Sequence, residues 1–324
     1  MKHSLLAAIL AFSFTSSAAM SATLEKVRIA GWSKPISEIT NILAEPDKGF
    51  FKAEGIDLGY VPGAGGGSAI ANMLSGAADV AFTDPASFYQ ALDKGEDLVA
   101  IYNIYPQNVF NVVSPVGRGI KTPADLKGKT IGVYSLSSGT RQNLQVLLHQ
   151  VGLKETDVKI KVTGLLNFAP VMQGQVDATA ATDTGLYVAK LKGIGEVDVI
   201  EVRDSLNVPS DMFVVRRNHY RDQKPLLRRF LKAYQKSAAW MISEPEEAAK
   251  IAITRSINGR NEKVNLAIIK LRNLSAQSQT TKAKGLGHFD VELLQKGADT
   301  FLELGLIKSK LEMKKVIFSD LIPK

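Results

Sequence analysis

Two stretches of this sequence match each other and decide the fold: Leu74-Ser75-Gly76-Ala77-Ala78-Asp79 and Met172-Gln173-Gly174-Gln175-Val176-Asp177. The first leads into an apolar run that ends at Thr83-Asp84, and the second into one that ends at Thr182-Asp183. Each is typical of a helix end, a glycine cap and a strand that begins at an aspartate and finishes with a polar pair. The two glycines are 98 residues apart, about the size of one small α/β lobe. We therefore predict two similar consecutive lobes; a chance match between two ordinary helix–strand turns is the alternative.

Strand patterns alternate with amphipathic helical patterns on both sides of these stretches, which is typical of an α/β protein. The clearest helix is 141–151, where Leu144, Leu147, Leu148 and Val151 share one face and Gly152 supplies the stop. After about residue 217 only helical patterns follow, which predicts helices packed over the outside of one lobe. We expect strands at 27–31, 56–61, 78–83, 98–105, 109–114, 130–134, 158–162, 177–182, 197–202 and 212–216, and late helices at 225–242, 245–254, 262–274 and 290–304.

The first 22 residues are typical of a signal peptide. Lys2 and His3 precede an apolar run at 5–14, and Ala19-Met20-Ser21 forms a cleavage-like pattern. A membrane anchor is the alternative, but the run is shorter than the roughly 20 apolar residues that span a bilayer. The chain has no cysteine, so neither disulfides nor a lipid-anchor cysteine is expected. We predict an exported protein that is free in a Gram-negative-type periplasm.

The composition is that of a globular protein, with 324 residues, 45% of them hydrophobic and 22% charged. The formal net charge is +8, which could indicate a nucleic-acid or anionic membrane partner. The basic residues are scattered, however, and their densest group, at 216–229, crosses a strand end and a helix. We interpret that group as a solvated face and expect no nucleic-acid partner.

A glycine-rich loop follows the second predicted strand and precedes a helical run. Its candidate ligand-binding residues are Gly65, Gly66, Gly67 and Ser68. Glycines allow close backbone approach, and helix-start N–H groups attract polar or anionic groups. The spacing matches neither the dinucleotide nor the P-loop motif, so no nucleotide cofactor is expected. The alternative is a flexible turn with Ser68 as an ordinary N-cap.

A serine-rich loop occupies the same position in the second predicted lobe, after a strand and before the helix at 141–151. Hydroxyl and backbone N–H groups at a helix start form a second polar site. Ligands of open α/β sheets bind beyond the carboxyl ends of the strands, where both loops would lie. The alternative for this loop is helix capping, which one serine would satisfy. The candidate residues are Ser135, Ser137, Ser138, Gly139 and Thr140.

Polar or aromatic residues at other predicted strand ends complete the candidate site. Asp84-Pro85 is also a strong helix start, with Asp84 as N-cap, and Asp183 could cap a helix in the same way. Trp32 could stack on a ligand, although a lone tryptophan is commonly a core residue. The candidates in this group are Trp32, Ser33, Thr83, Asp84, Thr182 and Asp183.

Signs of catalysis or of a metal centre are lacking in the sequence. His149, His219 and His288 follow the signal, and none has a partner at metal-ligand spacing. No G-x-S-x-G nucleophile elbow is present. We therefore predict a protein with no catalytic residues, no metal site and no cofactor.

Residues 26–240 resemble the nitrate/sulfonate/taurine-type solute-binding proteins of ABC importers, a group that includes binders of thiamine-pyrimidine precursors. The resemblance is carried by Gly49-Phe50-Phe51-Lys52-Ala53-Glu54-Gly55-Ile56, by residues 74–82, and by Ile120–Val133 with its Pro123-Ala124-Asp125-Leu126-Lys127-Gly128-Lys129-Thr130. Fungal pyrimidine synthases share the fold but use a cysteine-rich motif, which this chain cannot form. A secreted enzyme of that kind is the alternative to a binding protein.

The resemblance implies the type II periplasmic binding protein fold: two α/β lobes, a two-strand hinge and a ligand cleft between the lobes. It also implies a monomer that delivers its ligand to an ABC permease and its ATPase. We expect one lobe at 24–110 and 212–324, the other at 111–211, and hinges near 108–114 and 208–212. The net charge and the helix starts favour an anion or carboxylate as ligand. Equally, Trp32, Phe82, Phe110, Tyr134 and Phe168 would suit a flat aromatic or pyrimidine.

Overall fold

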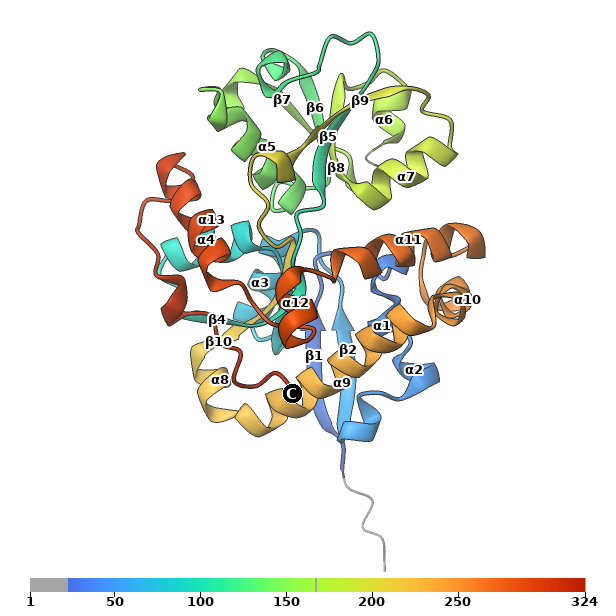
Figure 1. The fold of residues 1–324 in the computed structure, drawn as a ribbon, viewed down its shortest axis with the longest axis vertical. Coiled ribbons are helices and arrows are strands. Elements are labelled where there is room, and N and C mark those ends of the chain that lie inside the picture. The colour runs from blue at the N-terminus through green and yellow to red at the C-terminus, as the bar shows by residue number, and fades with distance from the viewer. Residues whose placement is uncertain (1–22, 167, 324) are drawn as a thin grey trace, which may run out of the picture.

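The computed structural model describes residues 23–166 and 168–323, and the predicted signal peptide at 1–22 lies outside them. The chain forms two five-stranded sheets, each with its own helices, arranged as two lobes (Figure 1). None of the helices in the described part of the chain combines the length and apolar character that a membrane crossing requires.

The first sheet has mixed strand directions. β1 pairs in parallel with β2 and β3, whereas β10 is antiparallel to both β3 and β4. Its strand order is β2 (Ile56–Val61), β1 (Glu25–Ala30), β3 (Val80–Thr83), β10 (Asp211–Arg216) and β4 (Leu98–Tyr105).

The second sheet repeats this arrangement strand for strand. β6 is parallel to β7 and β8, and β5 is antiparallel to β8 and β9. The repeat found in the sequence is therefore structural, because β3 and β8 hold the same central place in their sheets. The strand order is β7 (Lys159–Val162), β6 (Thr130–Val133), β8 (Ala178–Thr182), β5 (Phe110–Pro115) and β9 (Val197–Glu201).

The chain passes between the sheets twice, from β4 to β5 and from β9 back to β10. The two crossing segments are hydrogen bonded to each other. Ser210 N–H donates to the Tyr105 carbonyl at 2.9 Å, and the Asn108 side-chain amide donates to the Leu206 carbonyl at 3.0 Å. Each sheet thus holds one antiparallel strand that arrives directly from the other sheet.

Helices cover both sheets. Those of the second lobe are α5 (Gly139–Gln150), α6 (Ala169–Met172) and α7 (Asp183–Leu191). The first lobe has α1 (Thr40–Leu43), α2 (Glu45–Lys48), α3 (Gly66–Leu74), α4 (Pro85–Asp93), α8 (Arg217–Asp222), α9 (Lys224–Ser243), α10 (Pro245–Arg255), α11 (Glu262–Ser275), α12 (Gln279–Lys284) and α13 (Val291–Glu303). A long amphipathic helix, α9, buries Leu227, Phe230 and Tyr234 against the first sheet.

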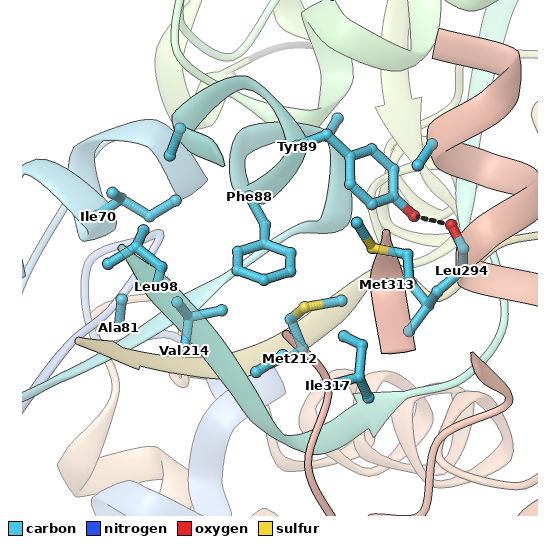
Figure 2. Close-up of a cluster of buried hydrophobic side chains, with 14 of the residues drawn as sticks. Ile70, Ala81, Phe88, Tyr89, Leu98, Met212, Val214, Leu294, Met313 and Ile317 are labelled. Atoms are coloured by element: carbon cyan, nitrogen blue, oxygen red, sulfur yellow. Dashed lines mark hydrogen bonds between the residues drawn. The ribbon is translucent and has the colours of Figure 1, made fainter. Parts of the chain in front are cut away.

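A hydrophobic cluster ties the end of the chain to the first sheet (Figure 2). Leu294, Met313 and Ile317 pack with Met212 of β10, and the hydroxyl of Tyr89 on α4 donates to the Leu294 carbonyl at 2.9 Å. This packing holds the starts of α4 and β10, and therefore Asp84 and Asp211, in fixed positions.

All ten predicted strands are present, with ends that differ by at most two residues from the prediction. The prediction of Asp84 as N-cap is confirmed, because its carboxylate accepts the Ser87 N–H at 2.8 Å. Two capping alternatives were wrong. α3 begins at Gly66 with Gly65 as its N-cap, so Ser68 lies inside the helix. Asp183 is the first residue of α7, and its N-cap is Thr182.

Candidate functional site

A cavity of about 280 Å³ lies between the lobes. The starts of α3 and α4 approach it from the first sheet, and the starts of α5 and α7 approach it from the second. Its walls are therefore made at the carboxyl ends of the strands in both sheets, where α/β proteins bind ligands.

Eight of the residues proposed from the sequence line this cavity: Trp32, Gly65, Gly66, Asp84, Ser138, Gly139, Thr140 and Thr182. Seven others lie beside it without forming its wall: Ser33, Gly67, Ser68, Thr83, Ser135, Ser137 and Asp183. Ser33 and Thr83 are fully buried, and their hydroxyls donate to the carbonyls of Lys34 and Gly66.

The glycine-rich and serine-rich loops contact each other across the cleft, which explains why some of their residues do not line the cavity. The Gly67 N–H donates to the Ser137 carbonyl at 3.0 Å. The hydroxyls of Ser135 and Ser137 both donate to the Ala64 carbonyl. These groups hold the two lobes together at one edge of the cleft.

The loop contact depends on two glycines. Gly65 has φ 112° and ψ 163°, a region open essentially only to glycine, and a Cβ there would lie 2.5 Å from the Ser137 carbonyl oxygen. A Cβ at Gly66 would lie 1.9 Å from Oδ2 of Asp84. The glycines therefore allow both the interlobe contact and the close approach of α3 to Asp84.

We expect Gly65→Ala to open the cleft, because the new methyl group would meet the backbone of the opposite lobe. Spin labels can be placed at Lys94 and Lys154, two exposed positions in opposite lobes of a cysteine-free chain. The label distance in ligand-free protein should lengthen by several ångströms. Gly76→Ala is the matched control, since Gly76 also has positive φ (82°) but a Cβ there meets nothing within 4 Å. The same distance distribution in both variants would show that the loop contact does not control closure.

Asp84 is one of three carboxylates in the cavity wall. It is only 3% exposed, and its oxygens accept from the N–H and hydroxyl groups of Ser87. Burial raises the pKa of Asp84 to about 6. The N-cap role and the place in the cavity wall are compatible, because α4 starts at the cleft.

Asp211 is a second wall carboxylate, and the sequence reasoning missed it. It is the first residue of β10, 8% exposed, and no side chain or backbone N–H of the described residues donates to it. Burial and the neighbouring charge of Asp84 raise the pKa of Asp211 well above its usual range. Asp211 lies within the predicted hinge at 208–212, and that position is the sequence feature that could have pointed to it.

The third carboxylate, Glu38, belongs to an ion cluster around Arg272 of α11. Arg272 is 1% exposed; its Nε lies 2.8 Å from Glu38 Oε2, and its Nη2 pairs with Asp183 at the start of α7. The Thr184 hydroxyl also donates to Glu38 at 2.8 Å. Although burial lowers the pKa of Arg272, the two carboxylates raise it above its usual value. The guanidinium is therefore neutralised by protein groups from both lobes.

The prediction that the late helices pack over the outside of one lobe holds for α9 and α13 but was wrong for α11. Asn258, Ile268 and Arg272 line the cavity, and α11 packs against α7 of the opposite lobe (Figure 1). Sequence periodicity identified α11 as amphipathic but could not show that its buried face would include an arginine at the cleft.

Backbone hydrogen-bond donors in the wall include groups at helix starts. Among the described residues, the N–H groups of Gly66, Gly139 and Thr140 have no hydrogen-bond acceptor, as expected in the first turn of a helix. They face a cavity that also contains the carboxylate acceptors. The site can therefore donate to a ligand from α3 and α5 and accept from it at Asp84 and Asp211.

Aromatic rings form much of the remaining wall. Trp32, Phe110, Tyr134 and Phe168 line the cavity, as expected for cleft-side aromatics. Phe82 does not: it is fully buried below Trp32, edge to face at 6.3 Å between ring centroids. Four rings around one small cavity suit a flat ligand.

The comparisons with known proteins give the family. Residues 36–248, more than half of the chain, match the family described as NMT1/THI5 like. The chain belongs to that family. This NMT1/THI5-like chain contributes Asn258, Ile268 and Arg272 to the cavity from beyond the matched residues, so part of the cavity wall lies outside the family match.

Relatives of the chain differ in what their names say they bind. It is 22% identical over 311 residues to the riboflavin-binding protein RibY of Chloroflexus aurantiacus, covering 93% of this chain and 87% of that one. It is 24% identical over 244 residues to a formylaminopyrimidine-binding protein of Halalkalibacterium halodurans, covering 74% and 73%. The fold is that of the periplasmic aliphatic sulphonate binding protein of Escherichia coli, at a TM-score of 0.65, 21% identity and coverage of 92% and 98%. The type II periplasmic binding protein fold is thus confirmed.

No group of three or more histidine, cysteine or carboxylate side chains within residues 23–166 and 168–323 is arranged to hold a metal ion. The ionic groups of the cavity are the carboxylates and the Arg272 cluster, with Lys192 at one end.

Proposed function

We propose that this chain is the exported solute-binding component of an ABC importer, and that its cleft captures a flat nitrogen heterocycle bearing hydrogen-bond donors, such as an aminopyrimidine. The observation that carries the proposal is the Asp211 carboxylate, which faces the cavity without a donor from the described protein groups. A buried acceptor of this kind is costly unless a ligand or water donates to it.

The charge of the wall favours a donor over an anion. Glu38, Asp84 and Asp211 all line the cavity, whereas the Arg272 guanidinium is already paired with Glu38 and Asp183. A sulfonate or carboxylate would be repelled by the ionised forms of Asp84 and Asp211 and would find no unpaired cation beside them among the described residues. An amino-substituted heterocycle instead relieves that repulsion by donating to them.

The remaining wall groups suit the same ligand. A pyrimidine presents ring-nitrogen acceptors beside its amino donors, which match the helix-start N–H groups of Gly139 and Thr140. The rings of Trp32, Phe110 and Tyr134 can cover its faces. The name of one relative, a formylaminopyrimidine-binding protein, agrees with this chemistry.

Binding would act by stabilising the closed form. Asp84 follows β3 and Asp211 begins β10, two strands of the first sheet, whereas Gly139 and Thr140 belong to the second lobe. One ligand can therefore contact both sides and shift the open–closed equilibrium. We propose the lobes as 24–110 with 212–324, and 111–211, which places β5 and β10 at their junctions. The closed monomer would deliver its ligand in the periplasm to a permease with its ATPase, without chemical change.

Calorimetric titration of the protein with 4-amino-2-methylpyrimidine, methanesulfonate and benzoate tests the ligand class. We expect the aminopyrimidine to bind one to one and to raise the melting temperature. At a ligand concentration of 100 Kd the stabilisation is about 2.7 kcal/mol. The bound compound should be recovered unchanged, as a binding protein requires and an enzyme does not. Tight binding of methanesulfonate with no response to the pyrimidine would reject the proposal in favour of an anion carrier.

A further inference from the structure

One face of α7 forms a long side of the cavity. Its lining residues Thr184, Gly185, Val188 and Ala189, together with the C-cap residue Lys192, follow the spacing of residues that share a helix face. The eight steps along the chain from Thr184 to Lys192, with a helical rise of 1.5 Å each, make this face about 12 Å long. The cavity is therefore elongated along α7, and a single six-membered ring would cover only part of it.

The chemistry of this face changes from one end to the other. At the start of α7, Thr184 contacts Glu38 and Arg272, the groups whose charges also act on Asp211. Further along, Val188 and Ala189 are apolar. At the far end Lys192, exposed to solvent, has no ion pair with any described residue. The three carboxylates are thus at one end and a free ammonium group is at the other.

The cavity also has an apolar wall beside α7. Phe168 packs against the helix, since a Cβ at Gly185 would lie 3.0 Å from its ring. Leu165 and Met172 line the cavity too, yet their side chains are 44% and 39% exposed. Apolar surface is therefore left facing solvent in the outer half of a site whose inner half is polar.

We propose that this outer half is a second subsite, formed by Leu165, Phe168, Met172, Val188 and Lys192, for an apolar extension of the ligand that ends in an anionic group. This inference rests on the proposed function, which gives the ligand a heterocyclic head with hydrogen-bond donors. It adds the chemical class of the rest of the ligand, which we call the tail. The ligand would then have a heterocyclic head at Asp84 and Asp211, an apolar body along α7 and a terminal anion beside Lys192. A lysine at this position can also interact with the carboxyl end of the helix dipole, so the test must separate the two roles.

Five probes distinguish head from tail: 4-amino-2-methylpyrimidine, its 5-pentyl and 5-(4-carboxybutyl) derivatives, and the two analogues that carry the same chains at C2 in place of the methyl group. Burial is worth about fourfold in affinity per methylene, so we expect the pentyl compound to bind at least tenfold tighter than the parent. The carboxylate should add a further factor of about two to five, typical of an exposed ion pair. Lys192→Met should remove only that last factor; a lysine that serves the helix dipole alone would leave it unchanged in the variant.

Substitutions in and beside α7 test where the tail of the ligand binds. Val188→Ser should reduce the gain from the pentyl group severalfold, measured as the ratio of the pentyl to the parent affinity within the same variant. Leu191→Ser is the matched control, because Leu191 is on the same helix, 56% exposed, and outside the cavity wall. Met172→Ser provides a second variant should Val188→Ser fold poorly. Binding of the parent without any gain from either pentyl isomer would overturn the second subsite while the head chemistry stands. Absence of binding by all the probes would overturn the proposed head, and this inference with it.

Discussion

Asp211→Asn is expected to weaken binding of 4-amino-2-methylpyrimidine by about 10- to 150-fold, as loss of a hydrogen bond to a charged acceptor does. The same substitution should raise the melting temperature of the ligand-free protein at pH 7.5, because it removes a carboxyl group whose ionisation is disfavoured by burial, which raises its pKa well above its usual range. A residue whose substitution weakens ligand binding and stabilises the ligand-free protein is one that serves binding at a cost in stability.

The pH dependence gives the sign of the stability effect. A carboxyl whose pKa is higher in the folded protein binds its proton more tightly there, so unfolding releases protons and stability falls as pH rises. For Asp84 this fall extends from about pH 4, the unfolded value, through about 6. Wild-type ligand-free protein should therefore gain stability from these two groups on acidification from pH 7.5 to 5.5. Asp211→Asn should reduce that gain.

Melting temperatures at the two pH values and calorimetric titration measure both effects. Asp57→Asn is the control, since Asp57 is an exposed carboxylate on β2 of the same sheet. If Asp211→Asn binds the pyrimidine as tightly as wild type, Asp211 does not contact the ligand and the donor argument fails.

Arg272→Met is expected to have the second large effect, on the closed form itself. Removing one partner of a buried ion pair costs about 3–5 kcal/mol, because the remaining charges are left in a poorly solvated place. The Asp183 side chain is 22% exposed, and it gains further hydration when the second lobe moves away from α11. We therefore expect the distance between labels at 94 and 154 to lengthen in ligand-free protein, and ligand affinity to fall with the population of the closed form.

The double variant Arg272→Met with Asp183→Asn is the control for this interpretation. It removes the uncompensated carboxylate along with the arginine, so part of the lost closure should return. Equal opening in the single and double variants would mean that Arg272 acts through packing alone. Wild-type distances in Arg272→Met would show that the ion cluster does not hold the lobes together.

Much of the architecture could be predicted from the chain because it is encoded locally. Alternating apolar runs mark the ten strands, and the repeat around Gly76 and Gly174 places β3 and β8 at equivalent positions. Trp32, Gly66, Asp84, Gly139 and Thr140 were found because strand ends followed by helix starts gather at one edge of a sheet.

The ligand chemistry of the cleft, in contrast, was decided by tertiary structure. The sequence determined two α/β lobes, two polar loops and a net charge of +8, which favoured an anion as strongly as an aromatic ligand. Folding turns lysines and arginines toward solvent but brings Glu38, Asp211 and Arg272 together from three distant segments. Hydrophobic periodicity predicts which face of a helix or strand is buried. It does not predict which buried charged side chains from distant segments will contact each other. For that physical reason a basic chain has a cleft whose wall holds more carboxyl groups (Glu38, Asp84 and Asp211) than cationic groups (Lys192 and Arg272).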